Sequence, residues 1–136
     1  MVAPPVVLVV AEKPSICNAI AAALAPGGRM ETRGGTPPVH EFPGSFRGQP
    51  AHFRVTSVVG HVFSTDFPQQ YQSWSSTDPL ELFDAPVKRN AEKPSIVRLL
   101  ERESRGCRYL ALFLDNDREG ENICFEVIRC AQLLPA

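Results

Sequence analysis

Two groups of acidic residues have the types and spacing of a site for a divalent cation. One is Glu12, and the other is the stretch "DNDREGE", which contributes Asp115, Asp117 and Glu119. Several carboxylates in one crevice repel one another, and a hard cation removes that penalty. Mg²⁺ suits such a set because it prefers oxygen ligands and needs only one or two carboxylates, leaving its other positions to water or phosphate.

Basic residues lie next to both acidic groups. Lys13 follows Glu12 directly and supplies a positive charge suited to a phosphate oxygen. Arg118 lies between the acidic positions, where it would either contact a phosphate or screen the acids. Together these residues predict magnesium-assisted phosphoryl transfer.

Both acidic groups follow a predicted strand. Residues 6–11, "VVLVVA", are apolar and mostly β-branched, which is typical of a strand buried on both faces of a parallel sheet, and 108–114, "RYLALFL", is a second such run. Ligands of open parallel sheets collect outside the carboxyl ends of the strands. If the two strands are neighbours, the acids converge there.

The remaining pattern indicates an α/β domain with a largely parallel sheet. One helix is expected to begin at Pro14 and Ser15 and run to Leu24. The other expected segments are a loop at 26–38, a hairpin within 39–59, irregular helical turns at 64–94, and helices at 94–104 and 118–134. The expected apolar faces are Ile16, Ile20, Ala23 and Leu24 in the first helix, Ile96, Leu99 and Leu100 in the second, and Ile123, Val127 and Ala131 in the third.

The hexapeptide "AEKPSI" occurs twice, at 11–16 and at 91–96. A buried strand precedes the first copy, so its Glu-Lys pair would emerge at the carboxyl edge of the sheet. The second copy follows the polar stretch "PVKRN", with no strand expected before it. We therefore interpret Glu92 and Lys93 as a solvated turn.

Two other interpretations account for the "DNDREGE" acids. In one, Asp117 caps the final helix while Glu119 and Glu121 complement its dipole. In the other, "DNDREGENICFE" is a calcium loop like that of an EF-hand. Such a loop needs a helix in front of it, and "YLALFL" resembles a strand.

Composition sets further limits. Hydrophobic residues make up 43% of the chain, charged residues 21%, and the net charge is -1, which is ordinary for a globular domain. The longest apolar run is far shorter than the roughly 20 residues that cross a bilayer, so no membrane partner is expected. The four cysteines have no metal-binding spacing, which favours reduced thiols in the cytosol or nucleus. A basic stretch, 88–108, is either a solvated face or a phosphate-binding surface.

Several motifs in order resemble a known family. A glutamate after one strand and DxDxE after another resemble the Toprim domain. The stretches "AEKPSI", "VTSVVGH" and "LDNDREGENICFEVI" are similar to type IA topoisomerases of the topoisomerase III group, most of all to the eukaryotic beta form. The resemblance implies one Rossmann-like Toprim domain over 1–136, with a mostly parallel sheet flanked by helices and a β-hairpin insertion.

The resemblance also implies roles. Glu12 would be the acid/base and a metal ligand, Lys13 would hold the scissile phosphate, Asp115 and Asp117 would bind Mg²⁺, and Glu119, with Arg118, would support the site. The reaction would be reversible cleavage of one nucleic-acid strand through a 5′-phosphotyrosyl intermediate, followed by strand passage and religation. The implied substrate is single-stranded DNA, with RNA as a second substrate. The implied partner is a Tudor-domain or OB-fold protein, and the implied location is the nucleus, with the cytoplasm second.

One departure from that family concerns the nucleophile. The family's tyrosine lies far downstream in a Ser-Tyr-Pro-Arg-Thr-like context, and neither Tyr71 nor Tyr109 has such neighbours. We therefore expect an N-terminal fragment of a larger enzyme, inactive alone. The alternatives are a Toprim primase or nuclease, or a non-catalytic module that binds nucleic acid or a partner. His61 is interpreted as structural, and Trp74, like Tyr71, as packed locally.

Overall fold

The fold is built around one mixed sheet. The computed structural model describes residues 3–66, 78–83, 88–91 and 93–131. Its main sheet has five strands in the order β2-β3-β4-β1-β7. β1 runs parallel to β4 and β7, whereas β3 runs antiparallel to both β4 and β2. The strands are β1 (Val6–Ala11), β2 (Glu31–Arg33), β3 (Val39–Phe46), β4 (Gln49–Ser57) and β7 (Cys107–Phe113).

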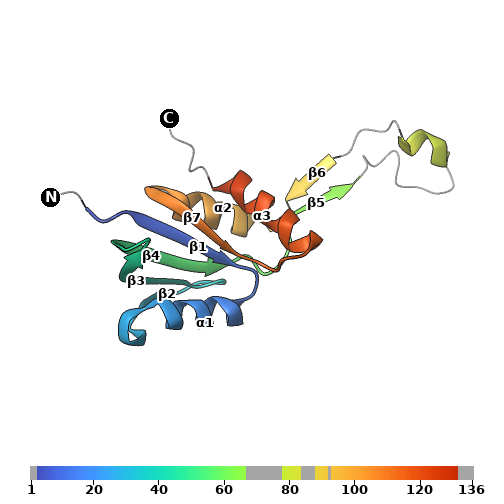
Figure 1. The fold of residues 1–136 in the computed structure, drawn as a ribbon. Helices are drawn as coiled ribbons and strands as arrows, with labels where there is room; N and C mark the ends of the chain where they lie inside the picture. Colours follow the sequence, from blue (N-terminus) through green and yellow to red (C-terminus); the bar gives the residue numbers. More distant parts are fainter. Residues whose placement is uncertain (1–2, 67–77, 84–87, 92, 132–136) are drawn as a thin grey trace.

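Helices cover both faces of this sheet (Figure 1). α1 (Pro14–Leu24) packs on one face, while α2 (Pro94–Ser104) and α3 (Arg118–Cys130) pack on the other. The predicted α/β class with a mostly parallel sheet is therefore confirmed. Prolines occupy the first turn of both α1 and α2, where the missing amide hydrogen costs nothing.

β1 is the most buried element of the sheet. Val7 to Ala11 are each at most 1% exposed, because β1 lies between β4 and β7 and has a helix layer on either face. Even-numbered side chains such as Leu8 point to the face covered by α2 and α3 and belong to the core there. Odd-numbered side chains such as Val9 point to the face covered by α1 and belong to a second core. This two-sided burial explains why the strand is apolar without alternation.

The predicted apolar face of α1 was mostly wrong, since Ile20 is the one residue of the four that packs against the core. Its buried side chains are Cys17 and Ala21, whereas Ile16 is 47% and Leu24 37% exposed. Small residues spaced by four allow the helix backbone to approach the sheet closely, and the larger side chains are left at the sides. The predicted faces of the other two helices are confirmed, since Ile96, Leu99, Leu100, Ile123, Val127 and Ala131 are all buried.

Short strands occur where none was predicted. β2 lies within the expected loop 26–38, and a separate two-stranded sheet pairs β5 (Phe63–Asp66) with β6 (Lys88–Ala91) in the region expected to contain only helical turns. Short 3-10 helices do form at Pro26–Gly28 and Pro79–Phe83. The predicted hairpin is confirmed as β3–β4, and it forms part of the main sheet because β4 pairs with β1.

A partly buried ion pair connects β2 to α2. Glu103, which is 3% exposed, accepts two hydrogen bonds of 2.6 Å from the Arg33 guanidinium. Arg54 donates to the Glu103 carbonyl oxygen at 2.8 Å, next to the end of α2. The hydrogen bonds from Arg33 lower the pKa of the Glu103 carboxyl. Their stabilisation is therefore present above the ordinary glutamate pKa and is lost as the pH falls through the lowered value.

Candidate metal centre at the carboxyl edge of the sheet

The ends of β1 and β7 place the acidic groups at one edge of the sheet. Ala11 pairs with Phe113 on one side and with Ser57 on the other. Ala11 and Phe113 are the last residues of β1 and β7, and they pair with each other. Glu12 follows Ala11 directly, and Asp115 lies two residues after Phe113, so both acids follow the same end of the strand pair. Figure 1 shows the two strands ending side by side. The prediction that these strands are neighbours is confirmed.

Most of the predicted site residues are accessible to solvent. Glu12 is half-buried, whereas Lys13, Asp115, Asp117, Arg118 and Glu119 are exposed. In the part of the chain that the structure describes, no three histidine, cysteine, aspartate or glutamate side chains lie close enough together to hold a metal ion. The acids thus share an edge of the sheet without forming a closed cage.

Asp117 caps α3. It is extended at φ -140°, and its Oδ1 accepts a hydrogen bond of 2.7 Å from the Gly120 amide. Glu119 and Glu121 lie in the first turn, where negative charge complements the helix dipole. The capping interpretation is confirmed, and it leaves the second Asp117 oxygen for another ligand. The calcium-loop interpretation is wrong, because the strand β7 precedes this loop instead of a helix.

Gly120 allows the first turn of α3 to approach Asp115. A Cβ atom at this position would lie 2.8 Å from the Asp115 carbonyl carbon and closer still to its oxygen. Since the obstacle is backbone, it cannot rotate away. Gly120 therefore fixes the distance between the end of β7 and the start of α3, and with it the relative position of Asp115 and Asp117.

The segment after β4 forms a third wall of this edge. The Val58 amide donates to the Ala11 carbonyl oxygen at 3.1 Å, and the Val59 amide donates to the Glu12 carbonyl oxygen at 2.7 Å. Val59 has a φ of +58° and Gly60 a φ of +94°. A positive φ is strained for a β-branched residue, and such strain is concentrated at functional sites.

His61 connects this segment to α3. Its Nδ1 lies 3.3 Å from Glu126 Oε1, and its Nε2 lies 3.8 Å from Glu119 Oε1. Glu126 Oε2 also accepts a hydrogen bond of 2.9 Å from the Val62 amide. These contacts agree with the structural interpretation of His61. The sequence did not indicate that Glu126 binds His61 and the Val62 amide, because these partners lie more than sixty positions away.

The second "AEKPSI" copy is not a solvated turn. Lys93 Nζ donates a hydrogen bond to the Val59 carbonyl oxygen, and a Cβ atom on Gly60 would lie 3.6 Å from Nζ. The strand β6 precedes this copy, contrary to expectation, although it belongs to the separate two-stranded sheet. Lys93 therefore contacts the segment that binds the Glu12 backbone, while Glu92 lies outside the described residues.

Sequence comparison settles the family. The family model described as "Toprim domain" matches residues 7–136. The chain belongs to the Toprim family. This confirms the resemblance drawn from the motifs at both strand ends, and places Glu12 and the "DNDREGE" acids within a Toprim domain.

The Toprim domain is similar to several curated topoisomerases. It is 61% identical over 128 residues to "DNA topoisomerase 3-beta" of Oryza sativa subsp. japonica, covering 93% of this chain and 15% of that protein. It is 48% identical to "DNA topoisomerase 3-beta-1" of Homo sapiens over 90% of this chain, and 42% identical to "DNA topoisomerase 3-alpha" of Arabidopsis thaliana over 92%. The chain spans about 15% of the length of these relatives.

Three further predictions concern the cysteines, membrane spans and the tyrosine and tryptophan residues. All four cysteines are unpaired, and no helix among the described residues is long and apolar enough to cross a membrane. Tyr71 and Trp74 lie outside the described residues. Tyr109 is half-buried near the start of β7, away from the acidic edge.

Replacing Gly120 by alanine should disrupt this edge. We expect Gly120→Ala to reduce the free energy of unfolding by about 3 kcal/mol, because the added methyl group meets the Asp115 backbone. Urea denaturation measures this loss. The matched control is Gly34→Ala, where the Cβ meets nothing within 4 Å and φ is not positive. Equal stability of the two variants would show that a side chain at position 120 does not clash with the Asp115 backbone.

Removing the Lys93 ammonium should loosen the segment after β4. We expect Lys93→Met to accelerate hydrogen exchange of the Val59 amide about fivefold, since one hydrogen bond of roughly 1 kcal/mol is lost. Amide exchange followed by NMR gives the rate. Lys93→Arg retains a donor and should restore protection, and Lys13→Met should leave the rate unchanged. An unaltered Val59 rate in Lys93→Met would show that the contact does not hold the segment.

Proposed function

We propose that this Toprim domain supplies the Mg²⁺-binding half of the active site of a type IA topoisomerase. The observation that carries the proposal is the parallel pairing of β1 with β7, which brings the Glu12 and "DNDREGE" ends to one edge. Its family membership and the names of its relatives, all DNA topoisomerases, support the same reaction class.

The residues at this edge suit Mg²⁺. All candidate donors are carboxylates, and Mg²⁺ needs only one or two of them, keeping water or phosphate in its other octahedral positions. Among the described side chains no three such donors lie close enough to hold an ion together, so one or two of these carboxylates would bind it at a time and water or phosphate would fill the other positions. Asp117 has one oxygen engaged as the helix cap and one remaining. We assign the metal to Glu12, Asp115 and Asp117, where it would neutralise charge on the reacting phosphate.

The other side chains have distinct proposed tasks. Glu12, half-buried just after the end of β1, moves the proton between the tyrosine hydroxyl and the leaving 3′ oxygen of the sugar. Lys13, exposed at the start of α1, holds the scissile phosphate. Arg118 adds a positive charge for the same phosphate, and Glu119, 3.8 Å from His61, supports the acidic edge.

The nucleophile belongs to another part of the enzyme in this proposal. Neither Tyr71 nor Tyr109 has the sequence context of the family's tyrosine, and Tyr109 is half-buried near the opposite end of β7 from Asp115. We infer that the Toprim domain alone neither relaxes supercoiled DNA nor forms a phosphotyrosyl adduct. Action on RNA, a Tudor-domain or OB-fold partner, and a nuclear location are further parts of the proposal.

Magnesium titration of the Toprim domain tests this function. In the wild type, Mg²⁺ should shift the backbone amide signals of Asp115 and Asp117 in NMR spectra. Glu12→Gln and Asp117→Asn should each weaken binding at least tenfold or so, since each removes a proposed ligand. Glu92→Gln is the matched control from the second motif copy and should bind as the wild type does.

Two results would contradict the assignment. One is an absence of any Mg²⁺ response in the folded wild type. The other is equal weakening by Glu92→Gln and Glu12→Gln, which would show that the effect is one of net charge. Strand cleavage by the Toprim domain alone would instead favour a Toprim nuclease.

A further inference from the structure

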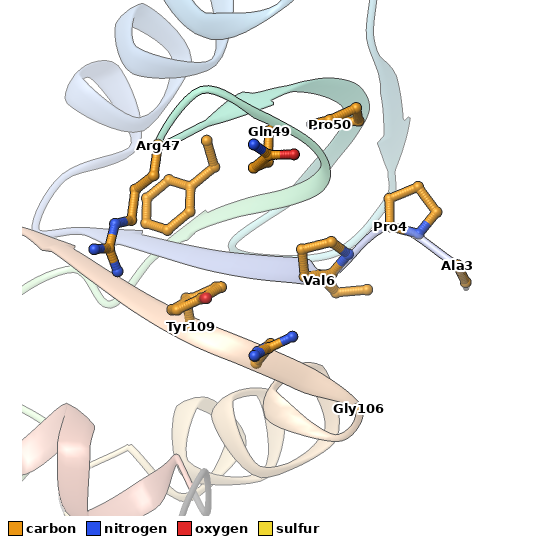
Figure 2. Close-up of a pocket in the computed structure, with 11 residues that line it drawn as sticks. Ala3, Pro4, Val6, Arg47, Gln49, Pro50, Gly106 and Tyr109 are labelled. Atoms are coloured by element: carbon orange, nitrogen blue, oxygen red, sulfur yellow. The ribbon is translucent and has the colours of Figure 1, made fainter. Parts of the chain in front are cut away.

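A cleft opens at the edge of the sheet opposite the acidic groups. It has a volume of about 970 Å³ and lies between the β3–β4 turn, the N-terminal approach to β1 and the start of β7 (Figure 2). None of the described residues that line it is acidic. Its charged lining residues are two arginines, Arg47 and Arg108, so the cleft is electropositive.

The two arginines differ from others in the same sheet. Arg33 and Arg54 each form an ion pair with Glu41 on their face of the sheet. Among the described residues, Arg47 and Arg108 form no ion pair, and both are exposed. Arg47 also has a φ of +54°, in the tight turn that presents its side chain at the cleft. Their guanidinium groups are therefore available to an anion.

Aromatic rings lie beside these arginines. The rings of Phe46 and Tyr109 have centroids 5.0 Å apart and are inclined at 48°, and both side chains are half-buried. The Arg108 guanidinium carbon lies 5.7 Å from the centre of the Tyr109 ring. Phe46 also packs edge-on against Phe53 of the core, which fixes its position. Rigid ring surfaces thus border the positive charges.

The combination selects a class of ligand. Guanidinium groups bind phosphate oxygens through paired N–H donors, and the accessible part of an aromatic ring stacks on a planar base. Figure 2 shows the Gln49 amide at the same opening, where it can donate to and accept from a base edge. An acidic peptide would use the arginines and leave the accessible part of the rings in solvent. A single-stranded polynucleotide uses all of these groups.

We propose that this cleft binds a single strand of nucleic acid, with Arg47 and Arg108 on phosphates and the Phe46–Tyr109 pair against a base. The exposed Arg105 ends α2 just before Gly106, a lining residue, and adds positive charge to the same edge. The cleft lies at the start of β1 and β7, whereas Glu12 and Asp115 follow their ends. Binding here is therefore independent of magnesium.

Fluorescence anisotropy with a short labelled oligothymidylate tests the proposal. The whole chain is titrated in EDTA, so that failure of the metal site cannot affect the result. Arg47→Ala and Arg108→Ala should each lower affinity about tenfold and reduce the slope of log affinity against log salt concentration by about 0.7. The matched control is Arg98→Ala, an exposed arginine within α2, which should bind as the wild type does.

A second pair of measurements separates bases from charge alone. Tyr109→Leu, checked for folding by circular dichroism, should also lower affinity about tenfold through lost stacking. A polyglutamate peptide of equal charge should compete only weakly. The proposal is overturned if Arg47→Ala and Arg108→Ala bind like Arg98→Ala, or if polyglutamate competes as well as the oligonucleotide, which would assign the cleft to an acidic protein.

Discussion

The parallel pairing of β1 with β4 and β7 sets both the core packing and the position of the acidic edge in this Toprim domain. Ala11 lies opposite both Ser57 and Phe113, so three strands end together. A slip of one residue would exchange the faces of Leu8 and Val9, which belong to different cores. The same register that satisfies both cores therefore also fixes where Glu12 leaves the sheet.

The sequence predicted elements whose signal is local. β1 and β7 are apolar runs, and α2 begins at a proline and has a strongly apolar side, so neighbouring residues suffice to identify them. β2 and the β5–β6 pair are short and depend on distant partners, such as the Arg33–Glu103 ion pair across seventy positions. The face of α1 was predicted wrongly because hydrophobic periodicity favours large side chains, whereas close packing on the sheet selects Cys17 and Ala21.

Like the fold, the candidate site was predictable where its signal is local in the sequence. Glu12 and the "DNDREGE" acids are recognisable because each follows a buried strand, and Asp117 because it precedes a helix. The positive φ of Val59 and the hydrogen bond of Lys93 were not predictable. Neither a backbone angle nor a contact between distant segments changes the spacing of residue types along the sequence. Both copies of "AEKPSI" begin a helix, and Lys93 of the second copy contacts Val59, the residue whose amide binds the Glu12 backbone of the first.

The two edges of the sheet have opposite chemistry. The carboxyl edge gathers Glu12, Asp115 and Asp117, whereas the other edge presents Arg47 and Arg108 beside aromatic rings. A metal ion suits the first edge and a polynucleotide the second, and one rigid sheet connects them. In the proposed enzyme, the Toprim domain would thus hold a strand at a distance from the place where another is cut.

Paramagnetic broadening by Mn²⁺ shows whether the ends of β1 and β7 form one metal centre. Mn²⁺ shares the preference of Mg²⁺ for carboxylate oxygens and broadens NMR signals of nearby nuclei. If the ends of β1 and β7 form one site, the amide signals of Lys13 and Asp117 will broaden together at the same Mn²⁺ concentration, and excess Mg²⁺ will restore both. Broadening at only one strand end, or at two different concentrations, would contradict a shared metal centre.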